Sequence, residues 1–117
     1  MNKMKSKLKL VVNNSIYQKE KFFFKKELQT ILNLYASKVS SGDWKDYGLS
    51  VNKREITFDI YQRSSDKPIY RISKNLNPKN KTEKFYVLDK NGKIVRNSES
   101  LDSLIRKVEW TKLKIVR

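Results

Sequence analysis

The apolar residues of this chain change from helical spacing to strand-like alternation between residues 39 and 56, and that change limits the folds that the chain can adopt. Ile56, Phe58 and Ile60 alternate with polar residues, which is the pattern of a strand with one buried face. Upstream, six apolar residues recur at the spacing of one helix face: Phe24, Leu28, Ile31, Leu32, Tyr35 and Val39. The sequence therefore predicts an α+β domain in which a helix of about four turns precedes a sheet.

Four segments are expected to form an antiparallel meander. Residues 54–63 and 68–74 alternate apolar and polar side chains, and the Ser, Asp and Pro between them favour a turn. Residues 85–88 and 94–96 flank Asn91-Gly92, a pair that accepts the positive φ angles of a tight hairpin. The expected sheet therefore has four strands, with a hairpin at its end.

A second helix should pack on this sheet and complete two layers. Residues 98–110 carry one apolar face at helical spacing, with Ser98 or Ser100 as the cap and acidic residues early. Residues 112–116 have the pattern of a short last strand. Residues 24–117 are thus expected to form a single domain, and residues 1–23 a basic variable tail or an edge strand.

The chain contains no cysteine and no histidine, which narrows its chemistry. Disulfides, thiolate nucleophiles, the usual general base near neutral pH and the commonest transition-metal ligands are all excluded. We therefore expect a protein that is not an enzyme, with no catalytic residues, no metal and no cofactor. No apolar run approaches the roughly 20 residues of a membrane span, and no signal sequence is evident. A soluble cytoplasmic protein without a membrane partner is the expectation.

The stretch between helix and sheet, residues 40–50, places two acids and two aromatic residues close together. Asp43 and Asp46 flank Trp44, and Tyr47 follows. Paired carboxylates can bind a hard cation or share a proton, but two ligands make no site. We favour the interpretation that Trp44 and Tyr47 fill the gap between helix and sheet while the acids cap the turn. Gly42 is the natural residue just past the helix end.

The formal net charge of +15 is concentrated in two regions, residues 1–26 and 62–96, each of which carries +7. Basic residues on adjacent strands can follow a phosphate backbone while a Tyr stacks on a base. Lys outnumbers Arg 21 to 6, which A/T-rich codons alone would produce. The basic cluster in the sheet region also includes Lys79, Lys81 and Lys84, and five residues are the candidate contacts with nucleic acid or an acidic protein: Arg63, Lys67, Arg71, Lys74 and Arg96.

Three stretches, 24–50, 61–74 and 85–116, together resemble a family of small alphaproteobacterial proteins known as a domain of unknown function. The resemblance is most specific in the helix, in the Asn-Gly hairpin and in two short signatures: Gly42, Trp44, Asp46 and Tyr47, and Pro68, Tyr70, Arg71 and Ile72. It implies a bacterial, cytoplasmic, stand-alone domain without an assigned activity or cofactor. Members of this family are less rich in Lys, which favours Arg63, Arg71 and Arg96 over the lysines as contacts.

Three functional hypotheses remain open from the sequence. The first is a non-enzymatic binding protein that uses a basic sheet surface. The second is an accessory protein that binds RNA or DNA, although none of the established nucleic-acid-binding motifs is present. The third is an adaptor or homodimer that uses an apolar patch or a free strand edge. The partner and the oligomeric state are not determined at this level.

Overall fold

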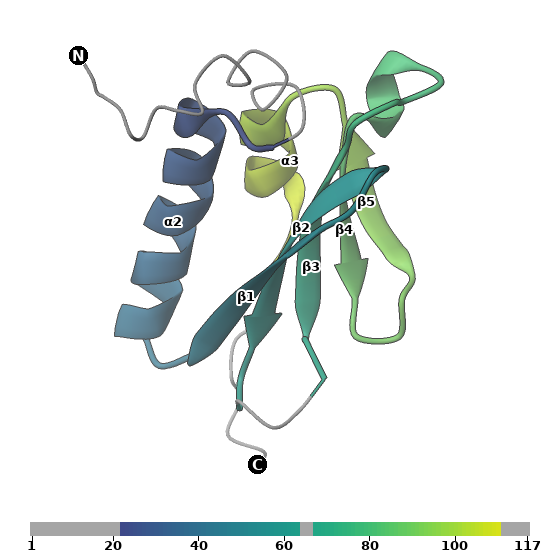
Figure 1. The fold of residues 1–117 in the computed structure, drawn as a ribbon. Helices are drawn as coiled ribbons and strands as arrows, with labels where there is room; N and C mark the ends of the chain where they lie inside the picture. The colour runs from purple at the N-terminus through teal and green to yellow at the C-terminus, as the bar shows by residue number, and fades with distance from the viewer. Residues whose placement is uncertain (1–21, 64–66, 111–117) are drawn as a thin grey trace, which may run out of the picture.

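A computed structural model describes residues 22–63 and 67–110. In chain order the elements are helix α2 (Lys25–Ser40), strands β1 (Asp46–Val51), β2 (Glu55–Tyr61) and β3 (Tyr70–Asn75), the 3-10 helix η1 (Lys81–Glu83), strands β4 (Phe85–Asp89) and β5 (Ile94–Ser98), and helix α3 (Leu101–Lys107). Both α-helices lie on the same face of the sheet (Figure 1). The α+β class and the two helices are therefore confirmed.

The sheet is an antiparallel meander of five strands in the order β1-β2-β3-β4-β5. The expectation of four strands is wrong by one, because β1 overlaps residues 40–50, which we interpreted as the corner between helix and sheet. The alternation of apolar residues in β1 is short and directly follows the turn after α2, so the sequence pattern predicts a strand there only weakly. Pairing with β2, from Asp46 opposite Tyr61 to Val51 opposite Ile56, supplies the backbone hydrogen bonds that make it a strand.

The turns of the sheet are held by Asn and Asp side chains. Asn52 Oδ1 accepts the backbone N–H groups of Arg54 and Glu55 between β1 and β2. Asp89 Oδ1 accepts the N–H groups of Asn91 and Lys93 between β4 and β5. The Asn-Gly hairpin is confirmed, but Gly92 alone has a positive φ there, of 81°. The hydrogen bonds to the Asp89 carboxylate stabilise this turn, which is wider than a two-residue hairpin turn.

Helix α2 begins with weak capping and ends with strong capping. At its start, Glu27 Oε1 accepts the N–H of Phe24 at 2.6 Å, and Phe24 offers no capping side chain. At its end, Gly42 has a φ of 86°. The N–H of Gly42 donates to the Val39 carbonyl at 3.0 Å, and that of Asp43 to the Lys38 carbonyl at 2.9 Å. This is a Schellman motif, and it confirms the expected helix end at Gly42.

Helix α3 is shorter than its sequence pattern suggests. It spans Leu101–Lys107, and Ser100 is the cap, with its Oγ accepting the N–H of Ser103 at 3.3 Å. The short strand expected at residues 112–116 lies outside the described residues, as does most of the segment 1–23. Phe23, however, is buried in the core, so the packed domain begins before residue 24.

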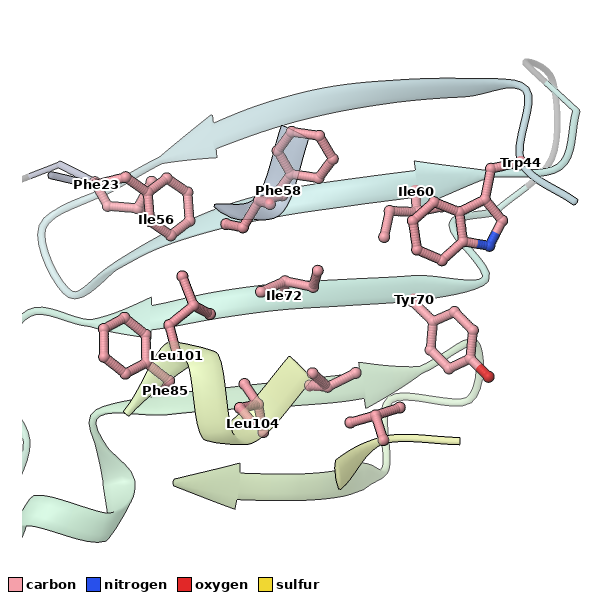
Figure 2. Packing of buried hydrophobic residues seen from close by; sticks show 13 residues of the cluster. Phe23, Trp44, Ile56, Phe58, Ile60, Tyr70, Ile72, Phe85, Leu101 and Leu104 are labelled. Atoms are coloured by element: carbon pink, nitrogen blue, oxygen red, sulfur yellow. The ribbon is translucent and has the colours of Figure 1, made fainter. Parts of the chain in front are cut away.

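The core lies between the helices and one face of the sheet (Figure 2). Two residues of the expected helix face, Phe24 and Val39, are exposed, because they lie at the two ends of α2, where the helix passes beyond the packed cluster. Trp44 is buried at the corner where α2 leads into β1. The buried apolar residues are Phe23, Ile31, Trp44, Ile56, Phe58, Ile60, Tyr70, Ile72, Phe85, Val87, Leu101, Leu104 and Val108.

Candidate functional site

Segments far apart in the sequence meet at one end of the sheet and line an open hollow of about 640 Å³. The end of β3, the loop to β4, the residue before α2 and the residues between β5 and α3 contribute to it. Four lysines line this hollow, Lys74, Lys79, Lys81 and Lys84, and Glu99 is the acidic residue of its lining. Positive charge is therefore gathered at this end of the sheet.

The loop between β3 and β4 is anchored by its backbone. The N–H of Asn75 donates to the Lys84 carbonyl at 2.7 Å, and that of Leu76 to the Arg54 carbonyl at 2.8 Å. The turn of η1 adds a bond from the Lys84 N–H to the Lys81 carbonyl at 3.2 Å. These bonds close both ends of the loop, so its lysines project from a fixed frame.

Three of the four lysines are available to a ligand. Lys79 and Lys81 are exposed, and Lys84 is half-buried. None of the three makes an ion pair with a residue in the described part of the chain. All three line the same hollow, which suits a ligand with several negative charges.

Lys74 behaves differently, because its strand position points it toward the helices. It pairs in register with Ile56 and Phe85, and it is 4% exposed. Its ammonium donates to Glu27 Oε1 at 2.8 Å and to the Phe22 carbonyl at 2.9 Å. We expected Lys74 on an exposed basic surface, whereas in the structure its charge is buried in an ion pair with Glu27.

Phe24 adds an aromatic surface to the hollow. Phe24 is 43% exposed, and the Lys74 ammonium lies 3.8 Å from the centroid of its ring. This cation-π contact and the start of α2 fix the position of the ring. From the sequence, Phe24 was expected only as part of the helix face. The exposure of Phe24 was not predictable from spacing, because the apolar spacing includes Phe24 in the helix face, whereas the structure places it just before α2.

The other candidate contacts do not join this hollow. Arg63 and Lys67 are exposed on the connection between β2 and β3, at the opposite end of the sheet. Lys67 and Arg71 line a second hollow of about 320 Å³ beside the β4–β5 turn. Arg96 is exposed on β5 and pairs with Val87, whose side chain points to the helices. The five candidates therefore do not form one basic face.

The sheet face away from the helices carries a polar row. Arg71 Nε lies 3.4 Å from Asp59 Oδ1 without a hydrogen bond to that oxygen, and Ser50 donates to Asp59 Oδ2 at 3.1 Å. Burial raises the pKa of the Asp59 carboxyl by more than Ser50 and Arg71 lower it. Arg71 thus lies beside an acid, which weakens it as an isolated contact for an anion.

Two further side-chain hydrogen bonds belong to this polar row. Thr57 and Ser73 share a buried hydrogen bond of 3.1 Å. Tyr86 donates its hydroxyl to Glu55 Oε1, and burial together with this hydrogen bond raises the pKa of Tyr86 to about 12. Apart from Asp59 Oδ1, which accepts no hydrogen bond from the described residues, these polar side chains are therefore hydrogen-bonded to one another.

In the stretch between helix and sheet, residues 40–50, the two acids and Trp44 make contacts within the fold. Asp43 Oδ2 accepts the Ser41 hydroxyl at 2.7 Å, and Asp46 Oδ1 accepts the N–H of Tyr47 at 2.8 Å. The Trp44 ring packs against Tyr70, with ring centroids 6.5 Å apart, and Pro68 is half-buried just before β3. No group of three or more potential metal ligands occurs among the residues described.

These features define a small two-layer α+β domain with a lysine-lined hollow at one end of its sheet. The chain matches the model of a family described as a protein of unknown function (DUF2794) over residues 21–105, and it belongs to this family. The matched region contains α2, all five strands and the first part of α3. No curated protein and no solved structure matches the chain. No helix in the described residues is both long enough and apolar enough to cross a membrane.

Proposed function

We propose that this chain is a non-enzymatic binding protein that holds single-stranded nucleic acid at the lysine-lined hollow. The observation that supports this proposal is the convergence of Lys79, Lys81 and Lys84 with the exposed ring of Phe24. Proteins that bind single strands combine a basic groove for the phosphates with aromatic rings on which bases stack. The hollow has both parts within one surface.

The charges of the hollow favour a ligand with several phosphates. The carboxylate of Glu27 compensates the buried charge of Lys74, whereas the three loop lysines have no such partner among the described residues. Their attraction for phosphate comes largely from the release of counterions, so binding should weaken steeply with salt. Because one face of the Phe24 ring is occupied by the Lys74 ammonium, the remaining exposed part is where a base would stack.

The test is a titration of a fluorescent single-stranded RNA at several salt concentrations. Replacing Lys79, Lys81 and Lys84 by Ser should reduce the slope of log affinity against log salt by about 2, since each neutralised phosphate contributes about 0.7. Phe24→Leu keeps an apolar contact with Lys74 but removes the flat ring. It should weaken binding about 5-fold or more with little change in the slope.

A charge-matched variant gives the control. Replacing Lys67, Lys90 and Lys93 by Ser removes the same charge from the other end of the sheet. That variant should retain most of the affinity and the salt slope. Equal losses in both triple variants, or no binding at low salt, would overturn the proposal. If polyglutamate competes as well as RNA and Phe24→Leu has no effect, an acidic protein is the partner instead.

A further inference from the structure

Strand β1 forms one edge of the sheet, and its outer side has no strand partner among the described residues. Tyr47, Leu49 and Val51 occupy alternate positions, and these residues are 44%, 44% and 58% exposed. Leu49 pairs with Phe58, and the Tyr47 ring stacks on Phe58 at 4.8 Å, so this apolar row lies on the face that bears the helices. An exposed edge of this kind is a template for pairing with another strand.

The hydrogen bonds of β1 show which backbone groups point outward. The N–H of Asn52 donates to the Glu55 carbonyl at 3.0 Å, so the backbone at Asn52 faces β2. By the period of two, Ser50 and Gly48 also face β2. The N–H of Tyr47 instead bonds to the carboxylate of its neighbour Asp46 at 2.8 Å. The backbone groups of Tyr47, Leu49 and Val51 therefore point away from the sheet.

We propose that a second copy of this chain pairs with β1 in antiparallel orientation, about a two-fold axis at Leu49. Outward backbone groups must meet outward groups, so odd-numbered residues face odd-numbered residues across the junction. Leu49 then faces Leu49 of the second copy, and Tyr47 faces Val51. Shifting the register by one such step, which is two residues, would place Leu49 opposite Tyr47 or Val51 and would bring Lys45 opposite Val51 or Lys53 opposite Tyr47. The axis at Leu49 thus gives a continuous apolar row across both copies.

The charge distribution favours a second copy at this edge over any other surface. The whole chain carries +15, so two copies repel each other at most approaches. Residues 27–61, which contain α2, β1 and β2, carry a net charge of −1, and Asp46 is the charged residue within β1. Repulsion between copies is therefore smallest where the β1 edges meet.

The opposite edge of the sheet is less suited to pairing. A bulge between Val87 and Leu88 interrupts the register of β4 with β5, and Arg96 lies exposed on β5. Bulges and basic side chains are the devices that protect sheet edges from pairing. Strand β1 contains no Lys, Arg or Pro between residues 46 and 51.

The absence of cysteine from the chain makes a direct test possible. In nuclease-treated protein, Leu49→Cys should give a covalent dimer in high yield with a short thiol-to-thiol cross-linker. Ser50→Cys is the matched control on β1, because its side chain points to the other face. Ile94→Cys is the control at the other edge, where the side chain is 63% exposed. Both controls should give little dimer.

The mass in solution gives an independent result. The native chain should show twice its 13.9 kDa mass by sedimentation at micromolar concentration or above. Leu49→Lys should shift it to the monomer while circular dichroism stays unchanged, since Leu49 is already exposed. A native monomer at every concentration, or equal cross-linking of Leu49→Cys and Ile94→Cys, would overturn the dimer. Neither outcome bears on RNA binding, because nucleic acid is removed first.

Discussion

At the scale of single residues, burial decides what a charged or titratable side chain does. Lys74 lies on the helix side of β3 and forms an ion pair with Glu27, while Lys79 and Lys81 on the neighbouring loop remain exposed. Asp59 and Tyr86 lie on the other sheet face, and burial raises the pKa of both. Residues of one type thus have separate roles according to position.

Tyr86 leads to a prediction about stability at high pH. Its folded-state pKa of about 12 lies above the ordinary 10.0, so the folded protein holds the phenolic proton more tightly than the unfolded chain. The resulting stability is fully present below pH 10 and is lost as the pH rises toward 12. Tyr86→Phe cannot titrate, so its free energy of unfolding should fall less across this interval. Urea unfolding at a series of pH values measures the difference; equal slopes in both proteins would contradict it.

At the scale of elements, glycine and Asn or Asp side chains end the helix and turn the strands. Gly42 ends α2 with a positive φ, and Asn52 and Asp89 hold the turns of two hairpins. Strand β1 is stabilised in another way, because its hydrogen bonds come from β2. Local residue chemistry therefore determines where elements stop, and pairing determines whether a short apolar segment becomes a strand.

Gly42→Ala should destabilise the domain by about 1 kcal/mol, because Ala at a φ of 86° is strained. A side chain there would meet no heavy atom within 4 Å, so the cost comes from the backbone and not from packing. Gly48→Ala in β1 is the matched control. An added Cβ at Gly48 would make an ordinary contact of 4.0 Å with Tyr61, and stability should stay the same or rise. Urea unfolding of both variants measures this, and equal losses would contradict the explanation.

At the scale of the whole molecule, the domain is two layers joined by an apolar core and a buried ion pair. Lys74 of β3 and Glu27 of α2 connect sheet to helix at 2.8 Å, at the end where the lysine-lined hollow lies. The β1 edge runs along the side of the sheet, away from the β3–β4 loop that carries the hollow's free lysines. The two proposed interactions therefore use separate surfaces.

The Lys74–Glu27 pair can be tested by a double-mutant cycle. Lys74→Met leaves the Glu27 carboxylate without its partner in a largely buried position, and it should cost about 3 kcal/mol of the free energy of unfolding. Glu27→Leu combined with Lys74→Met removes both charges and should recover most of that loss. Thermal and urea unfolding of the single and double variants give the coupling energy. A double variant as unstable as the sum of its singles would exclude this role.

Much of the fold follows from local patterns, and the candidate site does not. The helical spacing of apolar residues around Ile31 predicts a helix, the alternation around Phe58 predicts a strand, and the turn at Gly92 predicts a hairpin. Each of these patterns depends on near neighbours in the chain. Lysine spacing on strands and loops does not reveal which side chains share a surface. Lys74 and Lys84 both belong to the basic segment and both line the hollow, yet Lys74 is buried in an ion pair with Glu27 and Lys84 is half-buried without one in the described part of the chain.

The sequence by itself determined the α+β class, both helices, four of the five strands, the helix end at Gly42 and the burial of Trp44. These follow from hydrophobic period and backbone conformation, which act over a few residues. The tertiary structure decided that residues 46–51 form a strand, that Lys74 is internal, and that Phe24 joins three loop lysines at one hollow. Each of these depends on contacts between distant segments, and pairing energy and burial exist only once those segments have met.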